Sequence, residues 1–272
     1  MNRKNLKKYI LIVNKKVYQI IAYIKFLINS TNQHGVHSPF IYNFVTKCLY
    51  DNVKYTAYSK LKAYRNHLKN SKTVIEITDL GEGSKTLNSK KRSVSKMIQA
   101  SSSTEKESKL LFRITQYFNF KSVLELGTSL GMGTYAIALG NKFSNISTIE
   151  GCPNTSDYAK SKFQDLNIQN AAFIKGDFTS IIPTLQDRDF DFIIFDGHHN
   201  KAATIQYFES LLSKVHNETI FVFDDIYWSK GMTEAWEYIK AHNIVTVTID
   251  CFHLGFVFFR KEQVKEHFKI RL

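Results

Sequence analysis

The sequence predicts an α/β protein built on a seven-stranded, mostly parallel, doubly wound sheet whose last strand runs antiparallel. The first observation behind this prediction is that apolar, strand-like runs alternate with helical patterns from residue 111 onward, as in sheets covered by helices on both faces. The second is that the last two such runs, 244–250 and 254–260, are separated only by Cys251–His253. This connection is too short for a parallel crossover, so the two strands pair antiparallel or one leaves the sheet.

The distribution of charge is the third observation, and it divides the chain into two expected parts. The net charge is +13, but residues 1–110 hold 21 Lys or Arg against 6 Asp or Glu, whereas residues 111–272 hold 16 against 18. We therefore expect a basic, mainly helical N-terminal extension or lid over 1–110 and the α/β domain over 111–272. The basic part can attract anionic lipid, nucleic acid or an acidic substrate, and it can equally be a solvated surface.

Residues 5–29 have the pattern of a basic amphipathic helix. Isoleucine and valine recur at three- and four-residue steps between Ile10 and Ile24, with lysines around them. The uncharged run 17–24 is too short to span a bilayer, and we expect no signal peptide. Such a helix can lie on an anionic membrane surface, or its apolar face can dock on the main domain or on a second subunit, which would make a homodimer.

Composition is that of a globular protein from a reducing compartment. Hydrophobic residues make up 43% and charged residues 22% of the chain, which excludes wholesale disorder. The three cysteines, Cys48, Cys152 and Cys251, are far apart and odd in number, so they indicate neither a disulfide framework nor a metal-spaced cluster. We expect a cytoplasmic protein, located peripherally at the membrane if the N-terminal helix binds there.

Two segments precede the first strand of the predicted sheet. Residues 73–84 read as a strand followed by Asp79-x-Gly81-x-Gly83, and so compete with residues 122–135 as a ligand-binding turn. The polar, basic stretch after them lacks an apolar stripe, and no strand–helix series continues from it, so we expect a loop near the site entrance. Residues 101–108 are expected to be a polar connection to a helix that starts near Leu110.

The first strand of the domain, 122–126, runs into a turn that contains Gly127, Gly131 and Gly133, and a helical pattern follows. Glycines in such a turn let the backbone pass close under a ligand, and the free N–H groups of the helix point at that ligand. The spacing from Glu125 onward, E-x-G-x-x-x-G-x-G, differs from the dinucleotide pattern G-x-G-x-x-G.

This stretch resembles motif I of the class I S-adenosylmethionine-dependent methyltransferases, in which the first strand ends E/D-x-G and the loop runs on to G-x-G or G-x-S. The resemblance covers about Leu111–Leu272 and implies a Rossmann-like sheet with an antiparallel seventh strand. It also implies that the glycine turn, including Thr128 and Ser129, cradles the amino-acid end of the cofactor.

Further cofactor contacts are expected where the strands end, because ligands in such sheets bind beyond the carboxyl ends of the strands. The second strand ends at Glu150, which the resemblance assigns to the ribose hydroxyls. Gly176 and Asp177 follow the third strand and resemble the adenine-recognition position of the family. The expected cofactor-binding residues are Glu125, Gly127, Thr128, Ser129, Gly131, Gly133, Glu150, Gly176, Asp177 and Asp196.

Carboxylates also end the next two strands. The fourth strand ends in Asp196 and the fifth in Asp224 and Asp225, each after an apolar run. Packing does not explain them, because an unpaired buried carboxylate is costly. Hard divalent cations such as Mg²⁺ take oxygen ligands in this arrangement. We therefore expect the three carboxylates to converge at one edge of the sheet as metal ligands.

These carboxylates resemble those of the catechol O-methyltransferase-like branch, where an Asp after strand four and an Asp-Asn pair after strand five hold a metal that orients and acidifies a hydroxyl. Asp196 and Asp224 match this pattern. Asp225 stands where the branch has Asn, and the lysine that the branch places near the strand-four Asp is not evident. The sequence therefore leaves open whether a metal is required.

The remaining expected site residues follow the fourth and fifth strands. His198 and His199 are equal candidates for accepting a proton from the acceptor, and Asp196 is the third catalytic candidate. Tyr227 and Trp228 lie in the loop after the fifth strand and are expected to stack on a planar acceptor.

The predicted function is S-adenosylmethionine-dependent methylation of a hydroxyl on a small molecule, with Mg²⁺ or another divalent cation as an optional aid. One alternative is a nucleic-acid methyltransferase that uses the basic extension, although the residues after Asp196 lack the Pro-Pro-aromatic pattern typical of base-amine methylation in this superfamily. Another is a non-catalytic protein of the same fold that docks on a membrane or a subunit. The intact set of Glu125, Gly127, Gly131 and Glu150 argues against this alternative, because a site without a ligand has no physical need of it.

Overall fold

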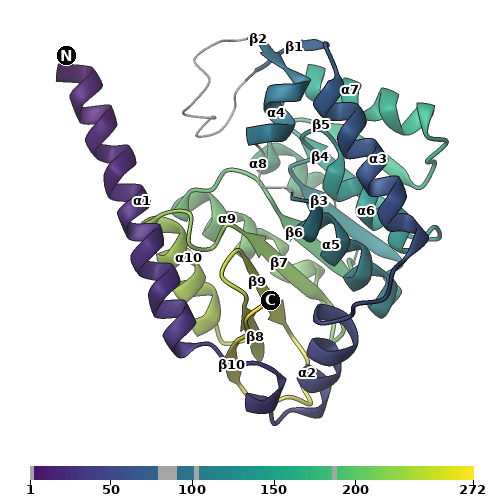
Figure 1. Ribbon diagram of the computed structural model, residues 1–272. Helices are drawn as coiled ribbons and strands as arrows, with labels where there is room; N and C mark the ends of the chain where they lie inside the picture. Colours follow the sequence, from purple (N-terminus) through teal and green to yellow (C-terminus); the bar gives the residue numbers. More distant parts are fainter. Residues whose placement is uncertain (1–2, 79–90, 101–103, 186–188) are drawn as a thin grey trace.

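One central sheet with helices on both faces organises the chain (Figure 1). The computed structural model describes residues 3–78, 91–100, 104–185 and 189–272. The strand order of the sheet is β10-β8-β9-β7-β6-β3-β4-β5. These strands are β3 (Ser122–Leu126), β4 (Asn145–Glu150), β5 (Ala171–Lys175), β6 (Phe192–Phe195), β7 (Ile220–Asp224), β8 (Val247–Asp250), β9 (Leu254–Phe258) and β10 (Glu266–Lys269).

The directions of the strands confirm the predicted fold class. β9 runs antiparallel to both of its neighbours, β7 and β8, whereas every other adjacent pair in this sheet is parallel. The short connection Cys251–His253 is therefore a hairpin turn between two paired strands, as its length requires.

The sheet has one strand more than the seven predicted. β10 pairs in parallel with β8 at the edge of the sheet, and Thr31 continues the pairing with Ile270. Phe268 is the one buried residue of this four-residue strand. Because an edge strand can be this short and this polar, it lacks the apolar run by which the other strands were predicted.

Each face of the sheet has its own core, because successive side chains of a strand point to opposite faces. Phe192 and Ile194 of β6 pack on one face with the first half of the chain, and Ile193 and Phe195 pack on the other face with later helices. The first face is covered by α2 (Pro39–Phe44), the π-helical turn Val45–Leu49 and α5 (Glu105–Phe118). The second is covered by α8 (Phe178–Ile181), α9 (Lys201–Leu211) and α10 (Lys230–Ala241).

A third apolar cluster joins helices from both expected parts of the chain. It is formed by α3 (Thr56–Asn70), α4 (Val94–Ala100), α5, α6 (Met132–Gly140) and α7 (Pro153–Asp165). Tyr64 of α3 donates its hydroxyl to the Leu130 carbonyl at 2.7 Å, and Arg113 of α5 donates to the Cys48 carbonyl at 2.8 Å. The division of the chain at residues 110 and 111 stays a prediction, and α5 runs across that position.

Helix α5 begins earlier than predicted. Thr104 and Glu107 form a capping box, in which the Glu107 N–H donates to Thr104 Oγ1 at 3.2 Å and the Thr104 N–H donates to Glu107 Oε2 at 2.6 Å. The prediction of a polar connection over 101–108 is therefore wrong for residues 105–108. The Thr-x-x-Glu spacing at 104–107 is the signal that would have located this helix start.

The competing glycine segment does not start from the main sheet. β1 (Val74–Glu76) pairs antiparallel with β2 (Lys91–Ser93) in a separate two-stranded sheet. Asp79, Gly81 and Gly83 lie outside the described residues. The expectation of a loop near the site entrance therefore stays a prediction.

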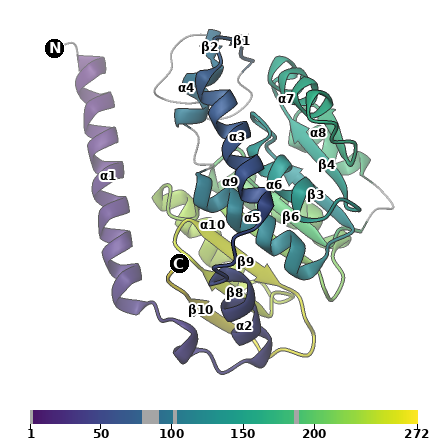
Figure 2. The same ribbon diagram turned by 45° about the vertical axis from the view of Figure 1, so that its right-hand side comes forward.

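The predicted N-terminal helix is present as α1 (Arg3–Asn29). Its C-terminal half lies beside α10, and its N-terminal half extends beyond the body of the molecule (Figures 1 and 2). Ala22 and Phe26 are its buried residues among those whose side chains are described. Within the described parts of the chain, no helix combines the length and the apolar character needed to cross a membrane.

Replacing Phe44 with alanine is expected to lower the free energy of unfolding by about 3–5 kcal/mol. The Phe44 ring is fully buried between the N-terminal segment and the sheet, against Phe118, Phe256 and Phe258, so its loss leaves a cavity there. Urea unfolding followed by circular dichroism measures the change, with Tyr42→Ala at an exposed position of α2 as the matched control. Equal stability of the two variants would contradict the role of α2 in the core.

Candidate functional site

The turn after β3 lies against the loop after β6. Gly127 has φ +112°, and a Cβ on it would lie 2.0 Å from the carbonyl oxygen of Asp196. The Asp196 N–H donates to the Leu126 carbonyl at 2.9 Å, which fixes the two segments together. The protein itself therefore requires glycine at position 127, a reason that the sequence prediction did not include. Gly131, with φ +76°, is the N-cap of α6, so the helix begins at this turn as predicted.

Glu150, at the end of β4, faces the glycine turn. Its Oε2 accepts the Ser129 N–H at 2.8 Å, and its Oε1 accepts the Cys152 N–H at 2.9 Å. Burial raises the pKa of Glu150, while these backbone N–H groups lower it. The carboxylate is thus held in a fixed position between the ends of β3 and β4.

Glu125 and Thr128 are buried behind the turn. The hydroxyl of Thr148 donates to Glu125 Oε2 at 2.6 Å, and the hydroxyl of Thr134 donates to the same oxygen. Burial raises the pKa of Glu125 to about 7, an effect that these two hydroxyls partly offset. Thr128 shares a hydrogen bond of 2.6 Å with Thr148, so its side chain belongs to the same buried network. Gly133 lies beside this network, since a Cβ there would be 2.5 Å from Glu125 Oε1.

Gly176 and Asp177 lie at the end of β5, next to Glu150. The Gly176 N–H donates to the Glu150 carbonyl at 3.0 Å, and Gly176 has φ +149°. Asp177 is the N-cap of α8, where its Oδ1 accepts the Thr179 N–H at 2.8 Å. The structure gives Asp177 a local role in helix capping, and its contact with a cofactor stays a prediction.

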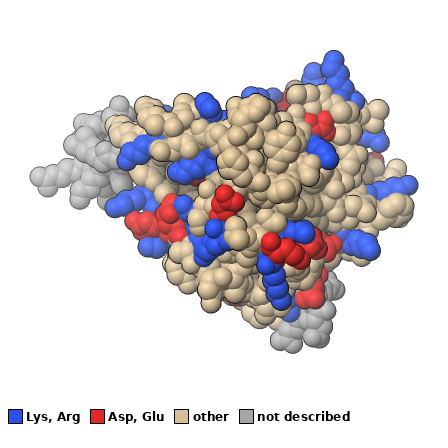
Figure 3. Space-filling model, turned by 90° about the horizontal axis from the view of Figure 1, so that it is seen from below, with Lys and Arg blue, Asp and Glu red and all other residues tan. Residues whose placement is uncertain are grey.

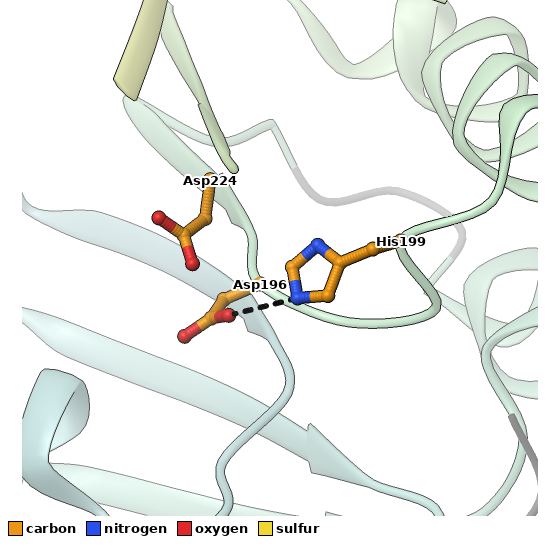
Figure 4. Close-up of side chains that lie close together, drawn as sticks. All are labelled: Asp196, His199 and Asp224. Carbon is orange, nitrogen blue, oxygen red and sulfur yellow. Dashed lines mark ion pairs between the residues drawn. The ribbon is translucent and has the colours of Figure 1, made fainter. Parts of the chain in front are cut away.

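Asp196, His199 and Asp224 come together at the carboxyl ends of β6 and β7 (Figure 4). The two strands are parallel and in register, with Phe195 opposite Phe223, so the aspartates that follow these residues are neighbours. One potential ligand atom from each of the three side chains lies within 4.8 Å of the others. His199 Nε2 is 3.8 Å from Asp196 Oδ1.

The electrostatics of this group disfavour two negative charges side by side. Burial and then the negative charge of Asp224 raise the pKa of Asp196 well above its usual range. A positive charge placed between the two carboxylates would relieve this repulsion. Of the predicted site residues, these are therefore the ones that the structure brings together as a potential cation site.

His198 and Asp225 are oriented differently from their neighbours. His198 has φ +51°, its Nδ1 is 2.7 Å from the Tyr207 hydroxyl, and its ring packs edge-on against Phe178. Asp225 has φ +53°, its carbonyl accepts the Trp228 N–H, and it is not in the three-residue group. The structure thus separates His198 from His199 and Asp225 from Asp224, pairs that the sequence treated alike.

Tyr227 and Trp228 also differ in their surroundings. Tyr227 donates its hydroxyl to Asp250 Oδ2 at 2.6 Å and stacks on Phe252 at 4.9 Å between ring centroids, so it is engaged within the fold. Trp228 is 39% exposed, and its ring centroid is 6.0 Å from that of His199. The two substrate assignments stay predictions, and the position of Trp228 favours it over Tyr227.

A small open pocket lies beside the carboxylates. It is lined by Glu107, Ser108, Leu111, Glu125, Gly133, Ile194, Asp196, Val222, Asp224 and Leu254. Helix α5 supplies Glu107, Ser108 and Leu111, none of which was among the predicted site residues. Only the capping-box spacing marked Glu107, and that signal predicts a helix start rather than a pocket.

Glu125→Gln is expected to change how stability depends on pH. Folding raises the pKa of Glu125 from 4.5 to about 7, so between these values the folded protein retains a proton that the unfolded chain has lost. The stabilising contribution is therefore complete below about pH 4.5 and is lost as the pH rises through about 7. Relative to Glu125→Gln, the native protein should lose about 3 kcal/mol of unfolding free energy across this range. Urea unfolding of both proteins measures it, and parallel pH profiles would contradict the raised pKa.

The segment that holds most of this site is similar to a known family of domains. A family profile described as a methyltransferase domain matches residues 124–226, from β3 to the loop after β7. No curated protein was found to match the chain. The O-methyltransferase from Bacillus cereus, solved in complex with SAH, is 17% identical with a TM-score of 0.51, and the alignment covers 76% of this chain and 92% of that one.

Two further solved structures share the fold. SAH-bound PaMTH1 from Podospora anserina is 15% identical with a TM-score of 0.53, covering 58% of this chain and 80% of that one. TomG from Streptomyces achromogenes, an O-methyltransferase in complex with SAM, is 18% identical with a TM-score of 0.51. The alignment covers 58% of this chain and 81% of that one. Together with the strand order, these likenesses show that the chain shares the fold of these S-adenosylmethionine-dependent methyltransferases, and residues 124–226 match the profile of a methyltransferase domain.

Proposed function

We propose that the protein transfers the methyl group of S-adenosylmethionine to a hydroxyl oxygen of a small molecule, with a divalent cation at the acceptor. The observation that carries this proposal is the convergence of Asp196, His199 and Asp224 beside the glycine turn. The Bacillus cereus and Streptomyces achromogenes proteins are described as O-methyltransferases, which supports oxygen as the accepting atom.

The residues around the glycine turn fit the cofactor. S-adenosylmethionine supplies a methyl group that its sulfonium already activates, so the protein has to align the acceptor with it. The carboxylate of Glu150 accepts backbone N–H groups of Ser129, Gly151 and Cys152 and retains lone-pair capacity for a ribose hydroxyl. The turn 127–131, where α6 begins, would bind the amino-acid end. Glu125 and Asp196 would make the pocket between them favourable for a positively charged ligand.

The side chains of Asp196, His199 and Asp224 fit a divalent cation. Asp196 and Asp224 offer carboxylate oxygens and His199 a ring nitrogen, all within 4.8 Å, a combination that suits Mg²⁺, Mn²⁺ or a similar ion. Such an ion would lower the pKa of an acceptor hydroxyl bound beside it. When no cation uses the lone pair of His199 Nε2, this atom can accept the hydroxyl proton. Trp228, exposed next to His199, would orient a planar acceptor.

The two alternative functions, the expected location and the expected partners remain predictions. A nucleic-acid acceptor is the main alternative, and a band-shift assay with RNA at increasing salt tests it, because phosphate contacts weaken steeply with salt. A non-catalytic role would be supported if no acceptor were methylated while the cofactor still bound. The cytoplasmic location, a homodimer and contact with an anionic membrane are likewise predictions, and the outer surface of α1 bears on the last of them.

Glu150→Ala is expected to weaken binding of S-adenosylhomocysteine by about 10–100-fold, since hydrogen bonds to a charged group contribute about 1.5–3 kcal/mol each. Titration calorimetry measures the affinity. Glu237→Ala, at an exposed position of α10, is the control and should leave it unchanged. An affinity equal to that of the native protein would remove Glu150 from the proposed ribose site.

Asp224→Asn is expected to lower the rate of methyl transfer by about 100-fold, since loss of even an outer-shell partner costs a metal site about 10–100-fold. The measurement is transfer of labelled methyl groups to a panel of catechols and simple alcohols, with Mg²⁺, Mn²⁺ or EDTA. Binding of S-adenosylhomocysteine should stay within about threefold, and Asp157→Asn at the surface should behave as the native protein. Undiminished transfer by Asp224→Asn in EDTA would retain the methyltransferase assignment and exclude the cation.

A further inference from the structure

Helix α1 contacts the domain along one side. Phe26 packs against Phe252 at 5.6 Å between ring centroids, and Ala22, one turn earlier, is 8% exposed. Another turn earlier, Tyr18 donates its hydroxyl to Thr233 Oγ1 of α10 at 2.7 Å. Positions 18, 22 and 26 lie above one another on the helix, so this side of α1 is covered by the domain.

The opposite side carries a continuous apolar surface, the outer stripe of α1, formed by Val13, Val17, Ile20, Ile24 and Ile28. These side chains are between 39% and 76% exposed. Ile20 and Ile24 lie roughly 160° to 200° around the helix from Ala22, and the stripe is roughly 22 Å long. Both ribbon views show the domain on one side of α1 (Figures 1 and 2). The stripe therefore cannot pack on the domain while the inner side keeps its contacts.

The charge of α1 is entirely positive. Residues 3–29 contain seven Lys or Arg and no Asp or Glu, and the first acidic residue of the chain is Asp51. Lys16 and Lys25 are exposed and lie on opposite sides of the outer stripe, roughly 60° and 120° around the helix from the line opposite Ala22, given 100° per residue. A second copy of the same helix would bring like charges together, whereas an anionic surface would be complementary to all seven.

Basic side chains of the described residues are distributed differently on the face seen from below (Figure 3). There, Lys and Arg side chains are interspersed with Asp and Glu rather than gathered in one basic field (Figure 3). Nucleic acid would engage the lysines of α1 but would leave the isoleucines of the stripe in water. A lipid surface with anionic headgroups would accommodate both.

We propose that α1 binds the surface of a membrane containing anionic lipids, with the outer stripe in the acyl boundary and Lys16 and Lys25 at the headgroups. This is the arrangement of an interfacial amphipathic helix, in which long basic side chains extend from the apolar boundary to the headgroups. The inner side of α1 would stay on the domain, where Lys15 Nζ lies 2.9 Å from the centroid of the Trp228 ring and Gln19 donates to the Trp228 carbonyl.

The test is flotation of the full-length protein with vesicles of phosphatidylcholine alone or mixed with phosphatidylglycerol. The native protein is expected to bind the mixed vesicles at least about tenfold more tightly, and more weakly at high salt. The double variant Ile20→Glu with Ile24→Glu should lose binding, as should Lys16→Glu with Lys25→Glu. Phe143→Glu with Val264→Glu, at positions that are each 77% exposed elsewhere, is the matched control and should bind normally.

Circular dichroism checks that each variant keeps the native helix content, which glutamate favours at exposed helical positions. Three outcomes of the flotation and scattering experiments would overturn the proposal. No binding of the native protein to mixed vesicles, or unchanged binding of the isoleucine variant, would exclude insertion of the stripe. If only the lysine variant lost vesicle binding, the contact would be purely ionic, as a contact with nucleic acid would be. If light scattering without vesicles showed a native dimer that the isoleucine variant converts to a monomer, a second copy would cover the stripe instead.

Discussion

The contact between Gly127 and the carbonyl of Asp196 is the constraint on which the site depends. The turn after β3 and the loop after β6 are so close that a Cβ at position 127 would lie 2.0 Å from the Asp196 oxygen. Because these segments end adjacent parallel strands, their contact puts the glycine turn and the first carboxylate of the cation group at one edge of the sheet. The register of β6 with β7 then adds Asp224. The residues proposed to bind the cofactor and the acceptor are thereby neighbours, although they lie on different loops.

The second feature is the concentration of negative charge at this edge. Glu125, Asp196 and Asp224 line one pocket, and burial raises the pKa of both Glu125 and Asp196. Two threonine hydroxyls support Glu125, whereas the negative charge of Asp224 disfavours a second negative charge on Asp196. A folded protein pays for such an arrangement in stability, and clusters of this kind are typical of binding sites. A sulfonium cofactor and a divalent cation are ligands that would turn this repulsion into binding.

The N-terminal segment serves two purposes at once. Phe44 and its neighbours complete one core of the sheet, so this part of the chain is structural. Helix α1 contributes Phe26 to a small separate cluster with Phe252 and presents its outer stripe to solvent. Helical periodicity alone could not show this, because the segment has apolar residues on both sides and only contact with the domain decides which side is buried.

The sequence by itself determined the sheet and the residues at its edge. Strand patterns, the length of the last connection and the glycine spacing are local properties. They therefore predicted the antiparallel β9, the turn at Gly127, and the carboxylates of Asp196, directly after β6, and Asp224, at the end of β7. They missed the edge strand β10, because a short strand with one buried side chain has almost no periodic signal.

Only the tertiary structure decided which of these residues act together. His198 and His199 are equivalent in sequence, but the positive φ of His198 directs its ring to Tyr207, whereas His199 lies beside Asp196. Glu107 enters the pocket from α5, a helix that precedes the sheet in the chain. Such proximities arise from packing between elements far apart in sequence, and for that reason no local pattern of residues encodes them.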